Sequence, residues 1–282
     1  MAQNPEEVKN RLENIHAIKP LLTALRTISL ANWKQAINKQ ELLKSYISNP
    51  KNIYIYLSSK LNQKPSAEIK PVETIIAIGS NRGLCGNFNR DIVDTINEII
   101  NESNQGKPKL LIFGDRLRKL LVRGNISFDK FFNFLNPSLN MFTHILNLAS
   151  PYFSTDINYR ISVIYNEYTG AAKYRTISKA IFPLTISRGV QSNIELSEYI
   201  YDTDPNLLLV YLERHLGVLS LYNAFLSSAA SEHSTRFQMM ESSSKNADRL
   251  SEELEIEVQF HRRQKITSEM QELAVGAGLL DK

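Results

Sequence analysis

The C-terminal part of the chain constrains the fold more than any other stretch. Residues 206–275 contain no proline and only one glycine, Gly217. Apolar or small side chains recur there at alternating spacings of four and three, which is the heptad pattern of a coiled-coil helix. The pattern runs through positions 212, 216, 219, 223, 226, 230, 233, 237, 240, 244, 247, 251, 254 and 258. It predicts one long helix. The alternative is two shorter helices, broken near Gly217 or around Ser242–Ser244.

A helix of this length needs a partner. About 70 residues at 1.5 Å per residue extend about 105 Å, more than a compact domain can bury. The N-terminal segment supplies the partner, because its apolar residues recur on one face of a helix, at Val8, Leu12, Ile15, Leu22, Leu25 and Ile28. Asn4, Pro5 and two glutamates are typical of a helix start. Pro20 lies inside this pattern, so we expect a bend at residues 16–20.

The C-terminal seam is unusually polar. Asn223, His233, Ser244 and Ser251 occupy seam positions where leucine or isoleucine would give more stable packing. We therefore expect a third surface to contact the coil at these positions.

The middle of the chain, residues 71–200, has a different pattern. Short apolar runs at 73–80 and 109–115 alternate with helical periodicity at 90–103, 116–124 and 139–153. Two long β-branched and aromatic segments follow, 159–170 and 173–184, with "NEYTGAA" as a hairpin connection. This order predicts a parallel sheet with an antiparallel edge. The fold class is therefore α/β. A Rossmann-like α/β domain (71–200) is inserted between long N- and C-terminal helices (1–60 and 204–282) that form an antiparallel coiled coil.

The segment "GSNRGLCGNFNRDIV", residues 79–93, raises the question of chemistry. Its glycines lack the spacing of dinucleotide-binding loops and the Gly-Lys-Ser/Thr end of a P-loop. Cys85 lies near a helix N-terminus, which could lower its pKa, but no histidine lies nearby in sequence to act as a base. The five histidines show no metal-ligand spacing, and one cysteine excludes a cysteine-cluster metal site. We predict no catalytic residue, cofactor or metal, and interpret the segment as a rigid strand-to-helix turn.

The net charge and the hydropathy of the chain argue against nucleic-acid-binding and membrane-spanning proteins. The net charge of +4 and sequence pI near 9.0 come without an arginine-rich patch with interleaved aromatics, so nucleic acid is not expected as a partner. No apolar run approaches the roughly 18 residues of a membrane span. The N-terminal 20 residues carry acids and no apolar core run, unlike a signal peptide, so we expect action on the cytoplasmic side of its compartment.

Three segments together resemble the γ subunit family of F-type ATP synthases over the whole chain. The C-terminal segment 231–280 carries the family's Ile-Thr-x-Glu-x-x-Glu-x-x-x-Gly-Ala string from Ile266 to Ala277. Matching residues before it are Ser231, Glu232, His233, Arg236, Met240, Asn246, Ala247, Glu253, Leu254 and Arg262. The loop "GSNRGLCGNFNRDI" resembles the family's central loop, and residues 8–25 align without gaps to its first helix. Several basic positions of that helix are replaced and Pro20 is added, which is compatible with a divergent or sodium-coupled-type member.

The resemblance implies a central rotor shaft without chemistry of its own, coupling proton or sodium flow to ATP synthesis or hydrolysis. Its partners would be the α and β subunits of F1, an ε-type subunit and the membrane c-ring, peripheral to an energy-transducing membrane. The residues implied in subunit contacts are Arg262, Arg263 and Thr267 near the tip, Glu232 and Arg236 lower on the helix, and Arg82, Cys85 and Arg90 from the central loop, which in the family faces an acidic loop of the catalytic subunit. The alternatives are a γ-like coiled-coil scaffold or adaptor that does not turn, and a Rossmann-type enzyme with helical arms.

Overall fold

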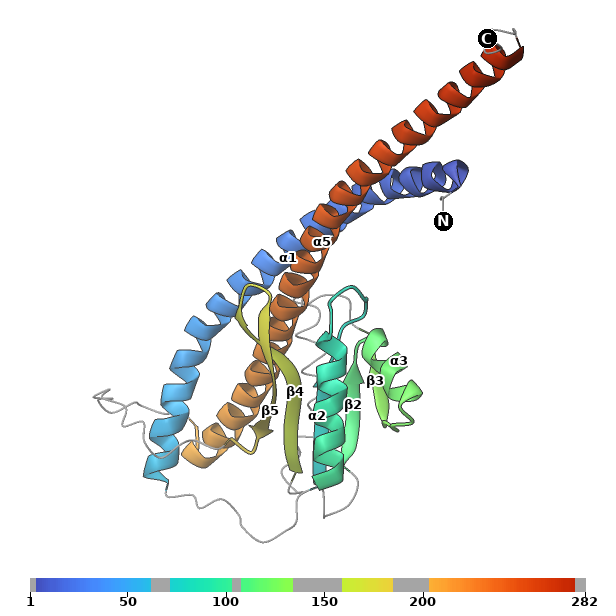
Figure 1. Ribbon diagram of the computed structural model, residues 1–282. Helices are drawn as coiled ribbons and strands as arrows, with labels where there is room; N and C mark the ends of the chain where they lie inside the picture. The colour runs from blue at the N-terminus through green and yellow to red at the C-terminus, as the bar shows by residue number, and fades with distance from the viewer. Residues whose placement is uncertain (1–3, 62–71, 103–107, 134–158, 185–202, 277–282) are drawn as a thin grey trace. The chain divides into compact units, whose positions relative to one another are not determined.

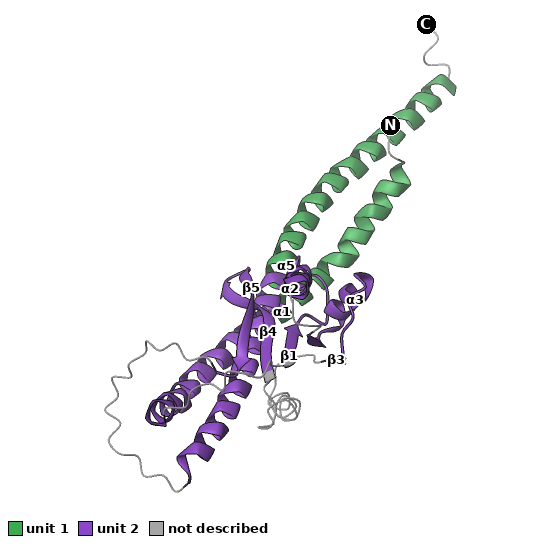
Figure 2. Cartoon of the chain, turned by 90° about the horizontal axis from the view of Figure 1, so that it is seen from below, with its two compact units in different colours: residues 1–28, 237–282 green, residues 29–236 purple. Residues whose placement is uncertain are grey.

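The structure is a computed structural model that describes residues 4–61, 72–102, 108–133, 159–184 and 203–276. The elements follow in the order α1, β1, α2, β2, α3, β3, β4, β5 and α5 (Figure 1). The chain divides into two compact units (Figure 2). Unit 1 contains residues 1–28 and 237–282, and unit 2 contains residues 29–236. Both long helices, α1 (Pro5–Lys60) and α5 (Pro205–Gly276), contribute to both units.

In unit 1 the two helices form an antiparallel pair. Lys19 Nζ lies 2.7 Å from Asp248 Oδ1, and Arg26 Nη1 lies 2.7 Å from Glu241 Oε2. Rising numbers on α1 therefore meet falling numbers on α5, as predicted. The predicted helix start is also confirmed, because the Asn4 side chain accepts a hydrogen bond from the Glu6 amide at 3.1 Å.

Within unit 2, α1 and α5 are also antiparallel. Gln40 Nε2 donates to Asn223 Oδ1 at 3.4 Å, and the Tyr46 hydroxyl lies 3.2 Å from His215 Nε2. Apolar clusters join the helices along this length, one of them formed by Tyr54, Leu57, Leu209 and Leu216. The prediction of a single C-terminal helix is confirmed, since α5 runs unbroken past Gly217 and Ser242–Ser244.

The predicted apolar face of α1 is confirmed except at Ile28. Val8 is buried, and Leu12, Ile15, Leu22 and Leu25 are partly buried. Ile28 is 53% exposed, whereas Ser29 is only 2% exposed. Five buried positions of α1, Val8, Ser29, Ala36, Leu43 and Leu57, are separated by multiples of seven, and the sixth, Tyr54, lies three residues before Leu57. Burial along α1 therefore follows a heptad with two seam positions. Pro20 does not interrupt the helix, which continues to Lys60.

The sheet in unit 2 has five strands in the order β3-β2-β1-β4-β5. β1 (Val72–Ile78) pairs in parallel with β2 (Lys109–Phe113) and β4 (Tyr159–Gly170), and β3 (Lys130–Phe132) continues the parallel part. β5 (Lys173–Phe182) pairs antiparallel with β4. The parallel core with an antiparallel edge is thus confirmed. The hairpin connection is shorter than predicted, because β4 includes the "NEYTG" stretch. The helix predicted over 139–153 lies outside the described residues.

Alternating side chains of the sheet pack on different helices. Ile76, Ile78 and Val163 point to α5, where they meet Leu221 and Phe225. Ile75, Ala77 and Ile112 point the other way, to α2 (Phe88–Glu102) and α3 (Asp115–Arg123). The result is a three-layer arrangement with α2 and α3 on one face and α5 on the other (Figure 1). The Rossmann-like character of the inserted part follows from this layering.

Small residues let one stretch of α5 in unit 2 be buried on all sides. Residues 224–231, "AFLSSAAS", are all buried. Ser228 Oγ donates to the Ile78 carbonyl at 3.3 Å, and Ser231 Oγ donates to the Asn166 carbonyl at 2.9 Å. These serines lie beside the predicted seam, not in it. The polar seam residues Asn223 and Ser251 bond across the coil to α1. The contact of a third surface with the polar seam positions stays a prediction.

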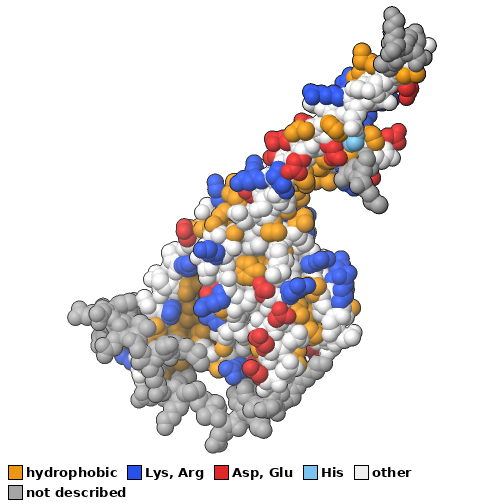
Figure 3. Space-filling view, in the orientation of Figure 1, with side chains coloured by type: hydrophobic (Ala, Val, Ile, Leu, Met, Phe, Trp, Pro, Cys, Tyr) orange, Lys and Arg blue, Asp and Glu red, His pale blue; other side chains and the backbone are white. Residues whose placement is uncertain are grey.

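None of the described helices contains an apolar stretch long enough to cross a membrane. Figure 3 shows acidic and basic side chains interspersed over the face that carries α2 and α3. The exposed acids of α2 include Asp94, Glu98 and Glu102, and the exposed basic residues of α3 include Arg116, Lys119 and Arg123.

Candidate functional site

The candidate site is the loop of residues 79–87, which leaves β1 and enters α2. Gly79 is required by close packing, because a Cβ there would lie 2.4 Å from Cβ of Leu117 on α3. Leu84 and Gly86 both adopt positive φ, 65° and 61°. The left-handed conformation is accessible to glycine but costs a leucine roughly 1–2 kcal/mol. The prediction of a tight strand-to-helix turn is confirmed.

Polar side chains brace the first half of this loop from within. Asn89 Oδ1 accepts a hydrogen bond from the Ser80 amide at 2.9 Å, and its Nδ2 donates to Ser80 Oγ at 2.8 Å. Ser80 Oγ in turn donates to the Arg82 carbonyl at 2.8 Å. The Asp115 amide donates to Asn81 Oδ1 at 3.0 Å, which ties the loop to the start of α3. These bonds hold the backbone in one conformation.

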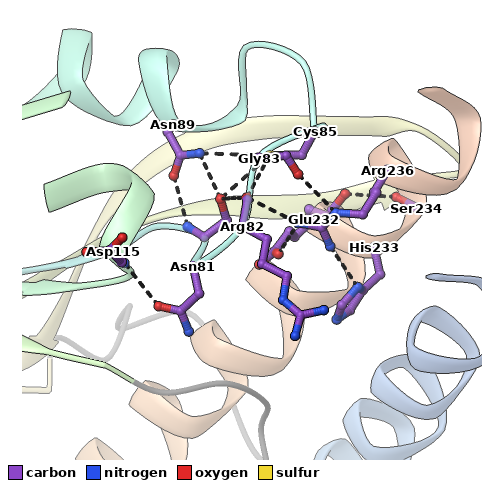
Figure 4. Close-up of polar contacts among 12 residues, drawn as sticks. Asn81, Arg82, Gly83, Cys85, Asn89, Asp115, Glu232, His233, Ser234 and Arg236 are labelled. Carbon is purple, nitrogen blue, oxygen red and sulfur yellow. Dashed lines mark hydrogen bonds and ion pairs between the residues drawn. The ribbon is translucent and has the colours of Figure 1, made fainter. Parts of the chain in front are cut away.

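Arg236 fastens the middle of the loop to α5 (Figure 4). Its side chain is almost fully buried, with Nε donating to the Gly83 carbonyl at 3.2 Å and Nη2 to the Arg82 carbonyl at 3.3 Å. Nη2 also lies 2.5 Å from Glu232 Oε1. Nη1 lies 3.2 Å from His233 Nδ1. The planar guanidinium can serve all four acceptors at once, which a lysine ammonium cannot do in the same geometry.

Burial and charge set the protonation of this cluster. Burial lowers the pKa of His233 to about 4, and the charges of Arg236 and Arg82 act in the same direction. Because arginine is only a donor, Nδ1 of the neutral imidazole must accept, which places the proton on Nε2. Burial raises the pKa of Glu232, while the charges of Arg236 and Arg82 oppose the rise. His233 is thus neutral at pH 7.

Cys85 lies inside the loop. Its thiol is buried and lies 3.6 Å from Ser80 Oγ and 3.8 Å from Asn89 Nδ2. Burial raises its pKa, with the Glu232 charge adding to the rise. The expectation that the nearby helix N-terminus could lower this pKa was therefore wrong. Cys85 belongs to the apolar layer between the sheet and α2, so its side chain does not form part of the exposed surface.

The sequence-predicted contact residues fall into two groups. Arg82 and Arg90 are exposed on the loop and at the start of α2, while Glu232 and Arg236 are turned inward against the loop. Arg262, Arg263 and Thr267 are exposed on the α5 segment of unit 1, with Thr267 Oγ1 bonded to the Arg263 carbonyl at 2.9 Å. The structure thus joins Glu232, Arg236, Arg82 and Cys85 into one cluster, and Arg262, Arg263 and Thr267 belong to the other unit.

Sequence reasoning missed the residues that shape the site. Ser80, Asn81 and Asn89 carry the internal bonds, and His233, predicted only as a polar position of the seam, accepts from Arg236. Two asparagines eight residues apart give no recognisable pattern, because only the fold brings their partners near, the backbone amides of Ser80 and Asp115 and the Ser80 hydroxyl. Among the described residues, no cluster of histidine, cysteine or acidic side chains could hold a metal ion.

Comparisons with known proteins agree on one family. The model of the family described as ATP synthase matches residues 4–280. The ATP synthase gamma chain of Fusobacterium nucleatum is 26% identical over 284 residues, covering 98% of this chain and 99% of the relative. That of Chloroherpeton thalassium is 26% identical over 302 residues, covering 98% of each.

Solved structures of low identity share the fold. A chain from the rotor of the Euglena gracilis mitochondrial ATP synthase superposes with a TM-score of 0.66 at 13% identity, covering 93% of this chain and 98% of that one. A chain from the central stalk and c-ring of the Tetrahymena thermophila mitochondrial ATP synthase gives a TM-score of 0.62 at 19% identity, covering 79% and 99%. With the family match over nearly its whole length, the chain belongs to the ATP synthase gamma chain family.

Proposed function

We propose that this gamma subunit works as the central rotor shaft of an ATP synthase and couples transmembrane ion flow to ATP synthesis or hydrolysis. One observation carries the proposal: α5 is a single helix of 72 residues. Its C-terminal part forms half of the antiparallel coil in unit 1, and its N-terminal part packs against the sheet in unit 2. A continuous helix shared by both units is a covalent path for torque.

A shaft acts by presenting different contacts to identical catalytic sites. A rotor can shift the affinity of a site only through contacts that differ between its rotational positions. Two regions of this chain offer directional contacts, the exposed arginines of the loop and those of the α5 tip. Arginine suits this role because its planar fork pairs with carboxylates. Arg82, Arg90, Arg262, Arg263 and Thr267 are the proposed contact residues.

The proposed partners follow from the family and from the assemblies named for its relatives. Rotor and c-ring structures contain chains of this fold, so we infer contacts with the α and β subunits of F1, with an ε-type subunit and with the membrane c-ring. The chain would then be peripheral to an energy-transducing membrane through the complex. It would supply no catalytic residue, and ATP would be bound and hydrolysed by its partners.

Reconstitution tests this function. We expect the purified chain to show no ATPase activity, and expect it to form a complex that hydrolyses ATP when α and β subunits of the same source are added. A chain that stays monomeric in their presence would contradict the rotor function. A complex that forms but whose hydrolysis drives no rotation of a bead attached to the chain would favour the scaffold alternative.

A further inference from the structure

β4 extends beyond the strand that pairs with it on one side. Its parallel pairing with β1 ends where Ala77 meets Ile164, yet β4 continues to Gly170 (Figure 1). Among the described residues, no strand lies beside this last part of β4 on the side away from β5. Buried peptide groups without a partner are costly, so another element has to supply their hydrogen bonds.

Two serines of α5 supply these bonds. The Tyr168 amide donates to Ser227 Oγ at 2.9 Å, and Ser231 Oγ donates to the Asn166 carbonyl at 2.9 Å. The Ser231 hydroxyl also lies 3.0 Å from the Ser227 carbonyl, so its proton is shared between strand and helix. Four helical residues rise about 6 Å, close to the roughly 6.6 Å of two strand residues, which lets both bonds form side by side. α5 thus takes the place of β1 beside the end of β4.

Asn166 and Tyr168 connect the same place to further elements. The Asn166 side chain is fully buried, with Nδ2 donating to the Phe88 carbonyl at the start of α2 at 2.8 Å. Its Oδ1 accepts from the Thr176 hydroxyl of β5 at 2.7 Å. The Tyr168 ring makes an edge contact with Trp33 of α1, with ring centroids 6.3 Å apart. The end of β4 is therefore joined to both long helices, to α2 and to β5.

The direction of these bonds fixes the rotational position of α5 against the sheet. Ser228 follows Ser227 and is turned by about 100° around the helix, and it donates to the Ile78 carbonyl at the end of β1 at 3.3 Å. α5 is therefore bonded to two strands in two directions. Hydrogen bonds weaken steeply when their angle is lost, whereas the hydrophobic effect has no direction. Rotation of α5 about its own axis would break the bonds and leave buried peptide groups unpaired.

We infer that Ser227, Ser231 and Asn166 are positioning residues of rotary coupling, which transmit torque between the shaft helices and the part of the chain from β1 to β5. The inference rests on the proposed function, which supplies the torque. A rotor under load needs stiffness about its axis, and the contacts that resist rotation bear that load. In this chain they are the directional bonds between α5 and the end of β4.

The angular fluctuations of an attached bead measure this stiffness. The complex with α and β subunits of the same source is immobilised through its ring, with hydrolysis stopped. A bead is attached to exposed Ser178→Cys on β5, and the native Cys85 is buried and does not compete for the label. The double variant Ser227→Ala/Ser231→Ala should widen the angular distribution of the bead. The same bead on exposed Lys44→Cys of α1 should show no change, because the helices keep their own contacts.

Two control variants separate torque from stability. Ser234→Ala removes a buried serine hydroxyl that donates within α5, to the Ser231 carbonyl at 3.1 Å, and should leave the angular width unchanged. Leu121→Ala opens a cavity in the apolar layer on the opposite face of the sheet. It should lower the melting temperature of the isolated chain by at least roughly 4 °C and still leave the angular width unchanged.

Ion pumping connects the junction to function. ATP-driven pumping against a gradient should move fewer ions per ATP hydrolysed in the double serine variant than in wild type. Each single serine variant should show the same changes to a smaller extent, so the test does not depend on assembly of the double variant. An angular width that the serine variants leave unchanged, or that Leu121→Ala widens equally, would overturn this inference alone. Failure of the wild-type chain to couple hydrolysis to rotation would overturn the proposed function, and this inference with it.

Discussion

At the scale of single residues, Arg236 decides whether the loop stays attached to α5. It joins two loop carbonyls, a carboxylate and an imidazole in one buried cluster. Each of these acceptors has left water to make the bond. Removal of the guanidinium therefore leaves several buried groups without a donor, which costs more than the loss of one exposed ion pair.

We expect Arg236→Met to lower the free energy of unfolding by about 3 kcal/mol, because Glu232 would remain partly buried without its counter-charge. Urea denaturation followed by circular dichroism measures the change. In the double variant Arg236→Met/Glu232→Gln, part of the loss should be recovered, since no uncompensated charge remains. A loss below about 1 kcal/mol in the single variant would mean that the cluster does not hold the loop.

His233 should make stability depend on pH. Its folded-state pKa is about 4, below the 6.5 of an unperturbed imidazole. In the unfolded chain this imidazole binds a proton below about pH 6.5. In the folded chain it does so only when the pH falls to about 4. Stability is lost as pH falls through this window, by roughly 3 kcal/mol in total.

The variant His233→Asn isolates this effect. Asparagine keeps an acceptor oxygen for Arg236 but does not titrate. Its stability relative to wild type should rise as pH falls from 7 to about 4, and contributions from other groups cancel in the difference. Thermal unfolding at a series of pH values checks it, and a difference that stays constant over this range would contradict the assignment of a buried neutral His233.

At the scale of elements, the phase of α1 decides which of its apolar side chains are buried. Leu42 and Leu43 are neighbours in sequence, yet Leu42 is 71% exposed and Leu43 only 8%. Leu43 packs with Leu219 and Leu226 of α5 in unit 2. Hydropathy alone treats the two leucines alike, and only the phase of the helix separates them.

We expect Leu43→Ala to destabilise the chain by about 2–4 kcal/mol, from lost burial and a cavity at the coil. The matched variant Leu42→Ala should change stability by less than about 0.5 kcal/mol. Chemical denaturation monitored through helical circular dichroism compares them. Equal effects would show that the coil in solution uses a different face of α1.

At the scale of the whole molecule, we expect the C-terminal end of α5 to bind partner subunits and to contribute little to the stability of the fold. Residues 262–273 are all exposed, and Ile266, Met270 and Leu273 are apolar residues among them. Exposed apolar side chains next to arginines are common where another protein binds.

Deletion of residues 262–282 should therefore leave the melting temperature of the isolated chain nearly unchanged. We expect the deletion to weaken the coupling of ATP hydrolysis to ion pumping more than it weakens assembly of the complex. The deletion removes contacts that differ between rotational positions, while the rest of the shaft remains. ATP-driven ion pumping per ATP hydrolysed, measured beside the yield of assembled complex, separates the two. Equal pumping with and without this segment would contradict the role of Arg262, Arg263 and Thr267.

Periodic and local features of the fold could be predicted from the sequence. The heptad of α5 predicted its length and burial, with none of the fourteen seam positions exposed. The capping residues predicted the start of α1, and the apolar runs predicted β1, β2, β4 and β5. These features repeat along the chain or depend on neighbouring residues, so the order of residue types in the sequence is enough to predict them.

Tertiary structure alone decided the rest. The inward position of Arg236, the neutral state of His233, the burial of Cys85 and the strained exposure of Leu84 depend on residues about 150 positions apart. The three-residue strand β3 was missed, because so short a strand has no pattern of its own and exists through its pairing with β2. The burial and the charges at the loop depend on the packing of β1, α3 and α5 around it. No residue spacing along the chain predicts that packing.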